Sequence, residues 1–219
     1  MVALNGIEET NWRTANSTYL DLAVEQMRQK LEYQAAQNLY QPPPESYDFE
    51  AELARVRATM SEPPALEQLC SAFNLNAFER DLLILCLGTE WYANWGDLCA
   101  SAGNSLFNFP TWSLACSASS HSSKGAATLD APLRQWNLIK VESSPSLQYA
   151  PLRINEWTLH YLTGYPCLDE ELMGVVKPVE GAEVSVPSHQ RLAQKMAALW
   201  DEDAPSQPII QLCGIDRAC

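Results

Sequence analysis

The sequence predicts a mainly α-helical protein with one small β-hairpin, and three observations lead to this fold class. Apolar residues recur at helical spacing along most of the chain, beginning with residues 20–31. Prolines at residues 42–44 and 63–64 interrupt these segments, because a residue without a backbone N–H ends a helix. Residues 138–154 instead have the composition of two short strands around a turn of Ser and Pro.

The composition is that of an acidic globular protein. The 219 residues are 47% hydrophobic, which is ample for a packed core. Asp and Glu number 27 against 14 Lys and Arg, so the net charge is -13. Because a surface of this sign repels phosphate backbones and anionic lipid, we expect neither a nucleic-acid nor a membrane partner.

Cysteine usage and the N-terminal segment predict a cytoplasmic protein. The seven cysteines are odd in number and have no C-x-x-C spacing, which favours reduced thiols over a disulfide framework. The first residues have no signal-peptide pattern, and the longest apolar run, residues 82–87, is too short to span a bilayer.

Two amphipathic helices are expected in residues 1–62, an N-terminal helical lead-in. Thr18 with Asp21 predicts the start of the first helix, and residues 49–60 supply the second. The pair is either a docking surface for a partner or a hairpin packed on the main core, and we favour the packed hairpin.

Residues 64–87 have a helix-turn-helix pattern. Asn76 and Glu79 predict a capping box at the start of the second helix. Residues 82–87 are apolar around the whole circumference of that helix, which predicts burial on most sides. Since a DNA-reading helix needs exposed donors and this one offers little beyond Arg80, we expect a core element.

Further short helices should follow. The helix is expected to break at Gly88 and resume through Trp95, and Thr111 should open another helix. Residues 115–127, with His121, have the composition of a surface loop. Asp130 is the expected cap of a short helix.

The predicted hairpin completes a winged-helix-like domain over residues 63–176. Its strands are residues 138–141 and 147–154, joined by residues 143–146. Gly164 is the expected stop of the helix that follows. Helices followed by a hairpin are typical of a winged helix.

The C-terminal segment begins like an α/β phosphate-loop module. After a linker over residues 177–187, Ser188 should cap a helix, and residues 208–212 should form a buried strand. Gly214 would be the first glycine of the motif G-x-x-x-x-G-K-[ST], and Cys219 occupies the position of the second. Residues 188–219 are thus the expected truncated start of this module, and an edge strand with a frayed tail is the alternative. The candidate nucleotide-binding residues are Gly214, Ile215, Asp216, Arg217, Ala218 and Cys219.

The order of several segments resembles a known family. They are residues 78–86, 130–139, 151–156, 160–164 and 210–214. The chain is similar here to bacterial and archaeal AAA+ ATPases that carry a winged-helix-like domain ahead of the ATPase module, including those associated with contractile injection systems.

The resemblance implies a noncatalytic recognition or positioning region in front of a ring-forming motor. ATP and Mg would belong to the full-length parent, and the partners would be a protein client and the rest of the ATPase ring. In this chain the sequence predicts no catalytic residue and no metal site, since it lacks metal-ligand spacings and hydrolase motifs. Two alternatives stay open: a DNA-binding winged-helix regulator and a stand-alone protein-interaction adaptor.

Overall fold

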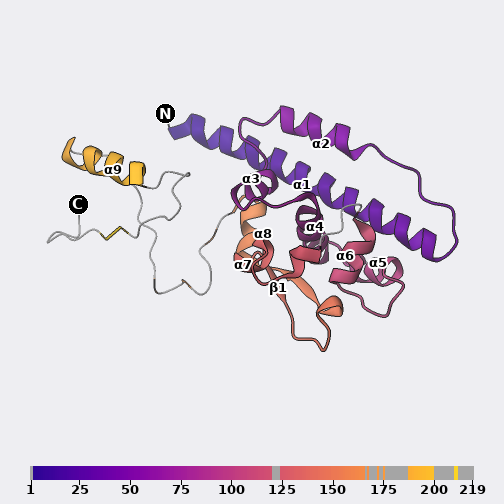
Figure 1. The fold of residues 1–219 in the computed structure, drawn as a ribbon. Helices are drawn as coiled ribbons and strands as arrows, with labels where there is room; N and C mark the ends of the chain where they lie inside the picture. The colour runs from indigo at the N-terminus through magenta and orange to yellow at the C-terminus, as the bar shows by residue number, and fades with distance from the viewer. Residues whose placement is uncertain are drawn as a thin grey trace. The chain divides into compact units, whose positions relative to one another are not determined.

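The computed structural model describes residues 2–119, 124–165, 167, 172, 175, 187–199 and 210–211 (Figure 1). The chain forms two compact units, Met1–Met173 and Gly174–Cys219. In chain order the elements are α1 (Val2–Asn38), α2 (Phe49–Ala58), α3 (Ala65–Ala72), α4 (Ala77–Trp91), α5 (Trp95–Ala102), α6 (Trp112–Ala118), η1 (Lys124–Ala127), α7 (Pro132–Gln135), β1 (Ile139–Val141), η2 (Leu147–Tyr149), β2 (Leu152–Ile154), α8 (Glu156–Leu162) and α9 (Pro187–Leu199). The predicted class, mainly α with a small hairpin, is confirmed.

Helix α1 is the spine of the first unit. Its 37 residues extend over about 55 Å at the α-helical rise, and it contacts α2, α4, α5 and α6 (Figure 1). The apolar stripe predicted from helical spacing is buried and consists of Leu20, Val24, Met27 and Leu31. This stripe joins one hydrophobic core that continues through α4 to Leu162 of α8.

Helix α4 lies at the centre of this core. Each residue from Leu82 to Leu87 is at most 2% exposed, as the apolar run predicted. The capping box is confirmed: the Glu79 N–H donates to Asn76 Oδ1 at 3.0 Å, and the Asn76 N–H donates to Glu79 Oε2 at 3.0 Å.

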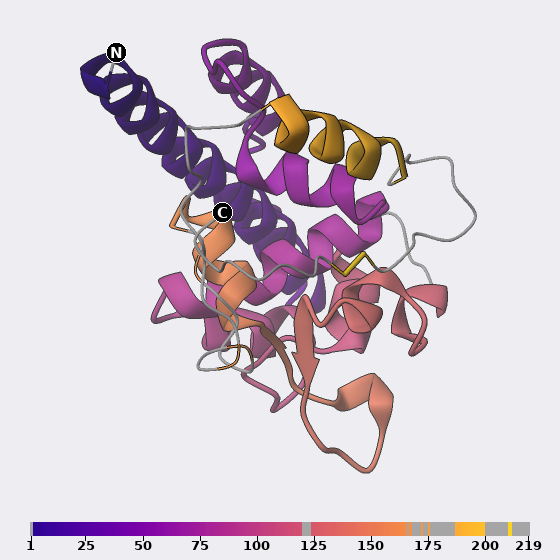
Figure 2. The same cartoon turned by 90° about the vertical axis from the view of Figure 1, so that its left-hand side faces the viewer.

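The two strands form an antiparallel hairpin beside α4. Ile139 pairs with Ile154 and Val141 with Leu152, and β2 contacts α4. The segment between the strands, which contains η2, projects from the helical body in both views (Figure 1 and Figure 2). We call this segment, residues 142–151, the wing.

Two predictions about helix ends are wrong. Helix α1 begins at Val2, not near Thr18, whose hydroxyl donates to Thr14 O within the helix. Tertiary contacts explain the longer helix, because the Trp12 indole N–H donates to Pro63 O and Asn16 bonds two other segments. The cap of α7 is not Asp130: the helix has Pro132 at its first position, where a fixed φ and a missing N–H favour a helix start.

Three further predictions also need correction. Helix α4 does not break at Gly88 but continues to Trp91, because Gly88 gives room for the Trp95 ring. The second strand is only Leu152–Ile154, since residues 147–149 form a 3-10 turn that packs on α6. Helix α6 extends to Ala118 into the predicted loop, of which residues 120–123, with His121, lie outside the described residues.

Other predicted boundaries agree with the structure. The Thr111 hydroxyl accepts from the Leu114 N–H at the start of α6. Gly164 has a positive φ of 79° after α8, as a helix-ending glycine should. In the second unit, α9 covers the predicted helix, but it begins at Pro187, so Ser188 lies inside its first turn and is not the cap.

Candidate functional site

The predicted phosphate loop lies outside the residues that the structure describes. This applies to residues 177–186 of the predicted linker, whose last residue, Pro187, begins α9, and to all six candidate nucleotide-binding residues, Gly214, Ile215, Asp216, Arg217, Ala218 and Cys219. Of the predicted strand at residues 208–212, only residues 210 and 211 are described. The nucleotide site therefore stays a prediction, and the described part of the chain has to be searched for its own functional surface.

Helices α3 and α4 have the order and the short connection of a helix-turn-helix. Residues 73–76 join them, with Asn74 in the left-handed region at a φ of 50° and the Leu75 N–H bonded to Cys70 O at 2.8 Å. In a DNA-binding protein of this class the second helix lies in the major groove and presents side chains to base edges. Helix α4 is the second helix of this pair, and α5, α6, η1 and α7 follow it before β1.

The burial of α4 is incompatible with groove reading. Besides the apolar run, Phe78, Glu79, Asp81 and Gly88 are also buried. The residues of α4 that are at least partly exposed are its first residue, Arg80 and its last three residues. The helix therefore has no polar face that could line a DNA groove.

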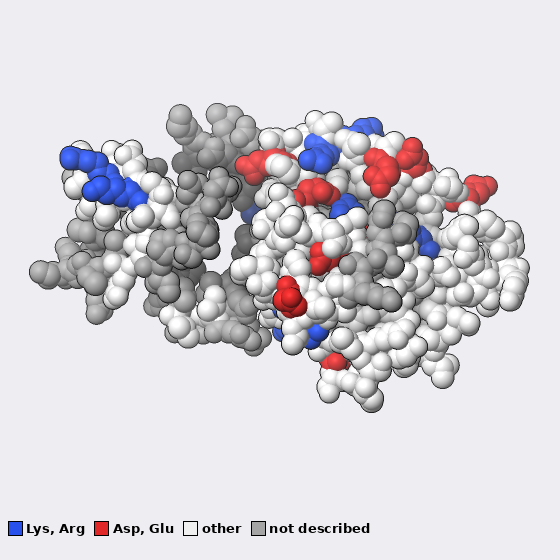
Figure 3. Space-filling view, viewed as in Figure 1, with Lys and Arg blue, Asp and Glu red and all other residues white. Residues whose placement is uncertain are grey.

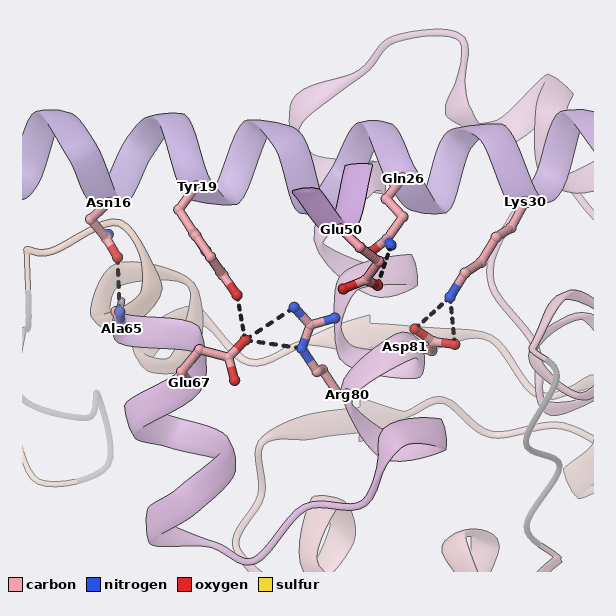
Figure 4. A network of polar contacts seen from close by, with 9 residues as sticks. All are labelled: Asn16, Tyr19, Gln26, Lys30, Glu50, Ala65, Glu67, Arg80 and Asp81. Carbon is pink, nitrogen blue, oxygen red and sulfur yellow. Dashed lines mark hydrogen bonds and ion pairs between the residues drawn. The ribbon is translucent and has the colours of Figure 1, made fainter. Parts of the chain in front are cut away.

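Arg80 is held by its neighbours on α3 and α1. Its Nε and Nη2 donate to Glu67 Oε1 at 3.2 and 3.1 Å, and the Tyr19 hydroxyl donates to the same oxygen at 2.7 Å (Figure 4). Burial raises the pKa of Tyr19 to about 12, and the hydrogen bond and charge of Glu67 act in the same direction. The cation of α4 is thus neutralised inside the domain.

A second set of buried polar contacts also connects α1 to the helix-turn-helix. Lys30 Nζ lies 2.9 Å from both carboxylate oxygens of Asp81, and the Ser119 hydroxyl donates to Asp81 Oδ2 at 2.9 Å. Asn16 donates to Leu162 O at 2.7 Å and accepts from the Ala65 N–H at 2.8 Å. Figure 4 shows these α1 side chains pointing toward α3 and α4. Asn16 and Asp81 are therefore satisfied by structural partners, and these contacts fix α1 in position.

Replacing Tyr19 with Phe should lower the free energy of unfolding by about 1–3 kcal/mol at neutral pH, because a buried hydrogen bond to a charged group is lost. The pKa of Tyr19 is higher in the folded protein than in the unfolded chain. The contribution of Tyr19 to the free energy of unfolding is therefore complete below pH 10 and falls as the pH rises toward 12. The difference between wild type and Tyr19→Phe should therefore shrink over that range. Urea denaturation at several pH values measures this.

Tyr33→Phe is the matched control on the same helix, since Tyr33 is 48% exposed. This variant should unfold like wild type at every pH. Equal stability of the two phenylalanine variants would mean that the Tyr19–Glu67 contact contributes nothing.

The wing also lacks the charges that bind DNA. Between β1 and β2 its only charged residue is Glu142, which pairs with Arg153 of β2 at 2.5 Å. Proteins that bind duplex DNA owe most of their nonspecific affinity to Lys and Arg on phosphates. This wing presents Ser, Pro, Leu, Gln and Tyr instead.

Apolar side chains gather where the wing meets the loop between α5 and α6. The Phe107 ring lies 5.5 Å from the Phe109 ring and 5.5 Å from the Tyr149 ring. Leu106 is 99% exposed, and Phe107, Leu147 and Tyr149 are between 37% and 44% exposed. We call Leu106, Phe107, Leu147 and Tyr149 the wing-end surface. Exposed apolar clusters of this kind mark interaction sites.

The wing-end surface lies in a part of the molecule with few charges. From residue 98 to residue 123 the sequence contains no Lys, Arg, Asp or Glu. Figure 3 shows the lower right of the first unit, where α5, α6 and η2 lie in Figure 1, as largely white, whereas acidic side chains cluster higher up. The wing-end surface is therefore apolar and has no charged residue of its own.

Searches for metal and membrane sites gave two negative findings for the described part of the chain. No three His, Cys, Asp or Glu side chains come together there as metal ligands. Of the helices described, none is long and apolar enough to cross a membrane.

Short helices followed by the antiparallel β1–β2 hairpin are the architecture of a winged helix, a class that indicates a DNA-binding or protein-interaction role. The chain belongs to the family described as winged helix domain, variant, whose model matches residues 10–176. Searches of curated proteins and of solved structures gave no match. The matched range includes most of α1, in agreement with the role of that helix in the core.

Sequence reasoning missed the wing-end surface and the partners of Arg80. Phe107 and Tyr149 are far apart in the chain, and no local spacing predicts their contact. The sequence feature that could have indicated the wing-end surface is an uncharged stretch that contains Leu106, Phe107 and Phe109 before Pro110.

Proposed function

We propose that this winged helix domain recognises a protein and does not read DNA. The observation that supports this most directly is the burial of α4, the second helix of the α3–α4 pair, which leaves that helix no polar face for a groove. The wing contributes no free cation of its own, and the net charge of -13 opposes approach to any polyanion. The uncharged wing-end surface is the corresponding place for a protein partner.

Duplex DNA should not bind the full chain even at low salt, where electrostatic binding is strongest. Fluorescence anisotropy with labelled duplexes of mixed sequence measures this directly. Affinity that falls steeply as salt is added would overturn the proposal and favour a DNA-binding regulator.

A protein partner should be found at the wing end in the native cell. A photoreactive amino acid in place of Leu106 should form one dominant protein adduct, identified by mass spectrometry. The same amino acid in place of Leu129, which is 74% exposed and lies before α7, is the matched control. Equal labelling from both positions would indicate nonspecific contact.

We further propose that the domain precedes an AAA+ ATPase module and positions its client. Support comes from the family resemblance and from α9, followed by the mostly apolar residues 208–212 and Gly214. In this proposal ATP and Mg bind the parent protein, the chain itself has no catalytic role, and the other partners are the subunits of the ATPase ring.

Peptide mapping of the protein from its native cell tests the ATPase proposal. A peptide that continues from Cys219 into Lys and Ser or Thr supports a phosphate loop, because these residues contact the phosphates and Mg²⁺. A native C-terminus at Cys219 would leave a stand-alone adaptor, with the protein-recognition proposal still intact.

A further inference from the structure

An exposed loop with three successive prolines joins α1 to α2. Every residue from 39 to 48 is exposed, and residues 42–44 are the prolines. Tyr40, on one side of them, is 98% exposed, and Tyr47, on the other side, is 52% exposed. Figure 1 shows this connection at the outer edge of the first unit. We call residues 39–48 the proline loop.

Helix α1 is closed before the first of these prolines. Its last residue is Asn38, Tyr40 lies in the left-handed region at a φ of 54°, and the Gln41 N–H donates to Ala36 O at 2.8 Å. A left-handed residue followed by such a backbone bond is a common way to end a helix. The end of α1 is therefore formed by other residues, and the role of the prolines has to be sought in the loop itself.

The backbone conformation of the prolines follows from their covalent structure. The ring of each proline fixes its φ at about -65° and restricts the preceding residue to extended conformations. Because each of residues 41–43 precedes a proline, one or both restraints act on every residue from 41 to 44. These residues therefore form a short polyproline II helix, which has about three residues per turn and no internal hydrogen bonds.

Contacts at its C-terminal end hold the proline loop in place. The Gln29 side-chain amide of α1 donates to Glu45 O at 3.1 Å, and Asp48 accepts from the Ala51 N–H at 3.1 Å where α2 begins. Within the described part of the chain, no donor bonds the carbonyls of residues 42–44. The loop is thus ordered before any partner binds, while its proline rings and carbonyls stay available.

This chemistry matches one mode of peptide recognition. Grooves lined by aromatic side chains bind polyproline II segments, as in SH3, WW and EVH1 domains, because the segment is already extended and loses little entropy. The charge of the loop adds a second requirement. Glu45 and Asp48 are its only charged residues, so a groove with acidic side chains at its rim would repel it.

We propose that the proline loop is a ligand for an aromatic-lined, polyproline-binding groove of a partner protein. The rim of that groove carries no acidic side chains. This inference goes beyond the proposed function, because the proline loop shares no residue with the wing-end surface and would give the domain a second contact with proteins.

Purified SH3, WW and EVH1 domains with neutral or basic groove rims are the probes, and titration calorimetry against the full chain measures binding. At least one of them should bind. Replacing all three prolines, Pro42→Ala, Pro43→Ala and Pro44→Ala, should weaken this binding about tenfold or more, because alanine loses both the ring contacts and the fixed conformation. Pro145→Ala, in the exposed turn of the wing, is the matched control and should bind like wild type.

A synthetic peptide of residues 39–48 keeps the test independent of folding. It should compete with the full chain for the same probe, and the peptide with three alanines should not. If none of the three domains binds, the loop is only a spacer between α1 and α2 and the inference is overturned. Equal binding by the wild-type and the triple-alanine chain would overturn it as well.

Cross-linking extends the test to the native partner. A photoreactive amino acid in place of Tyr40 should label a protein at a peptide that contains Trp, Tyr or Phe of its groove, and the peptide of residues 39–48 should suppress the adduct. An adduct that this peptide does not suppress would overturn the inference. The wing-end proposal stands or falls separately, because its own cross-link starts from Leu106.

Discussion

A fragment of residues 63–176 should not fold on its own, although it contains the complete helix-turn-helix and hairpin. Helix α1 supplies four large buried side chains to the core, Leu20, Val24, Met27 and Leu31. At about 1.5–3 kcal/mol for each, their burial contributes about 6–12 kcal/mol. That equals much of the roughly 5–15 kcal/mol by which a domain is usually stable.

The polar contacts of α1 strengthen this expectation. Without α1, Asp81 would lose Lys30, and Glu67 and Arg80 would lose Tyr19. The loss of these contacts adds to the loss of apolar burial.

Circular dichroism and ¹H–¹⁵N correlation spectra should show a collapsed or unfolded 63–176 fragment next to a folded 1–176 fragment. Adding a peptide of residues 1–62 to the 63–176 fragment should restore dispersed amide signals from that fragment, because the peptide supplies the apolar face of α1 that the core lacks. Cooperative thermal unfolding of the 63–176 fragment alone would show instead that residues 1–62 are a dispensable lead-in.

Gly88→Ala should destabilise the protein by about 3 kcal/mol or more, although alanine normally favours a helix over glycine. A Cβ at this position would lie 2.2 Å from two atoms of the Trp95 ring. That ring is 1% exposed, and its N–H donates to Leu85 O at 3.0 Å, so it has no room to move away.

A double-mutant cycle with Trp95→Leu isolates the cause. The smaller side chain removes the ring that meets the new methyl group, so the two substitutions together should cost less than the sum of the single changes. Chemical denaturation measures each variant, and Thr89→Ala, next to Gly88 on α4, serves as the control. Additive effects would mean that the clash with Trp95 does not limit residue 88.

Much of the local structure could be predicted from the sequence because its causes lie within a few residues. The spacing of Leu20, Val24, Met27 and Leu31 predicts which face of α1 is buried, since a helix turns every 3.6 residues. Asn76 and Glu79 bond each other's backbone and so define the start of α4 locally. The apolar run of α4 predicts a buried helix before any partner is known.

The candidate site could be predicted only in part. The unsuitability of α4 for DNA follows from its sequence, because a helix that is apolar on all sides must be buried. The wing-end surface could not be predicted in the same way, since Phe107 and Tyr149 meet from two segments that are far apart in the chain. The predicted nucleotide contacts from Gly214 to Cys219 rest on a motif alone, and they remain a prediction.

The sequence by itself determined the fold class, the buried faces and the burial of α4, because each depends on local periodicity, capping and composition. Only the tertiary structure decided that α1 begins at Val2, that α4 passes through Gly88, and that Glu67 binds both Arg80 and Tyr19. These features depend on contacts between residues far apart in the chain. Contacts of this kind are determined by how the helices pack against one another, which local sequence patterns do not specify.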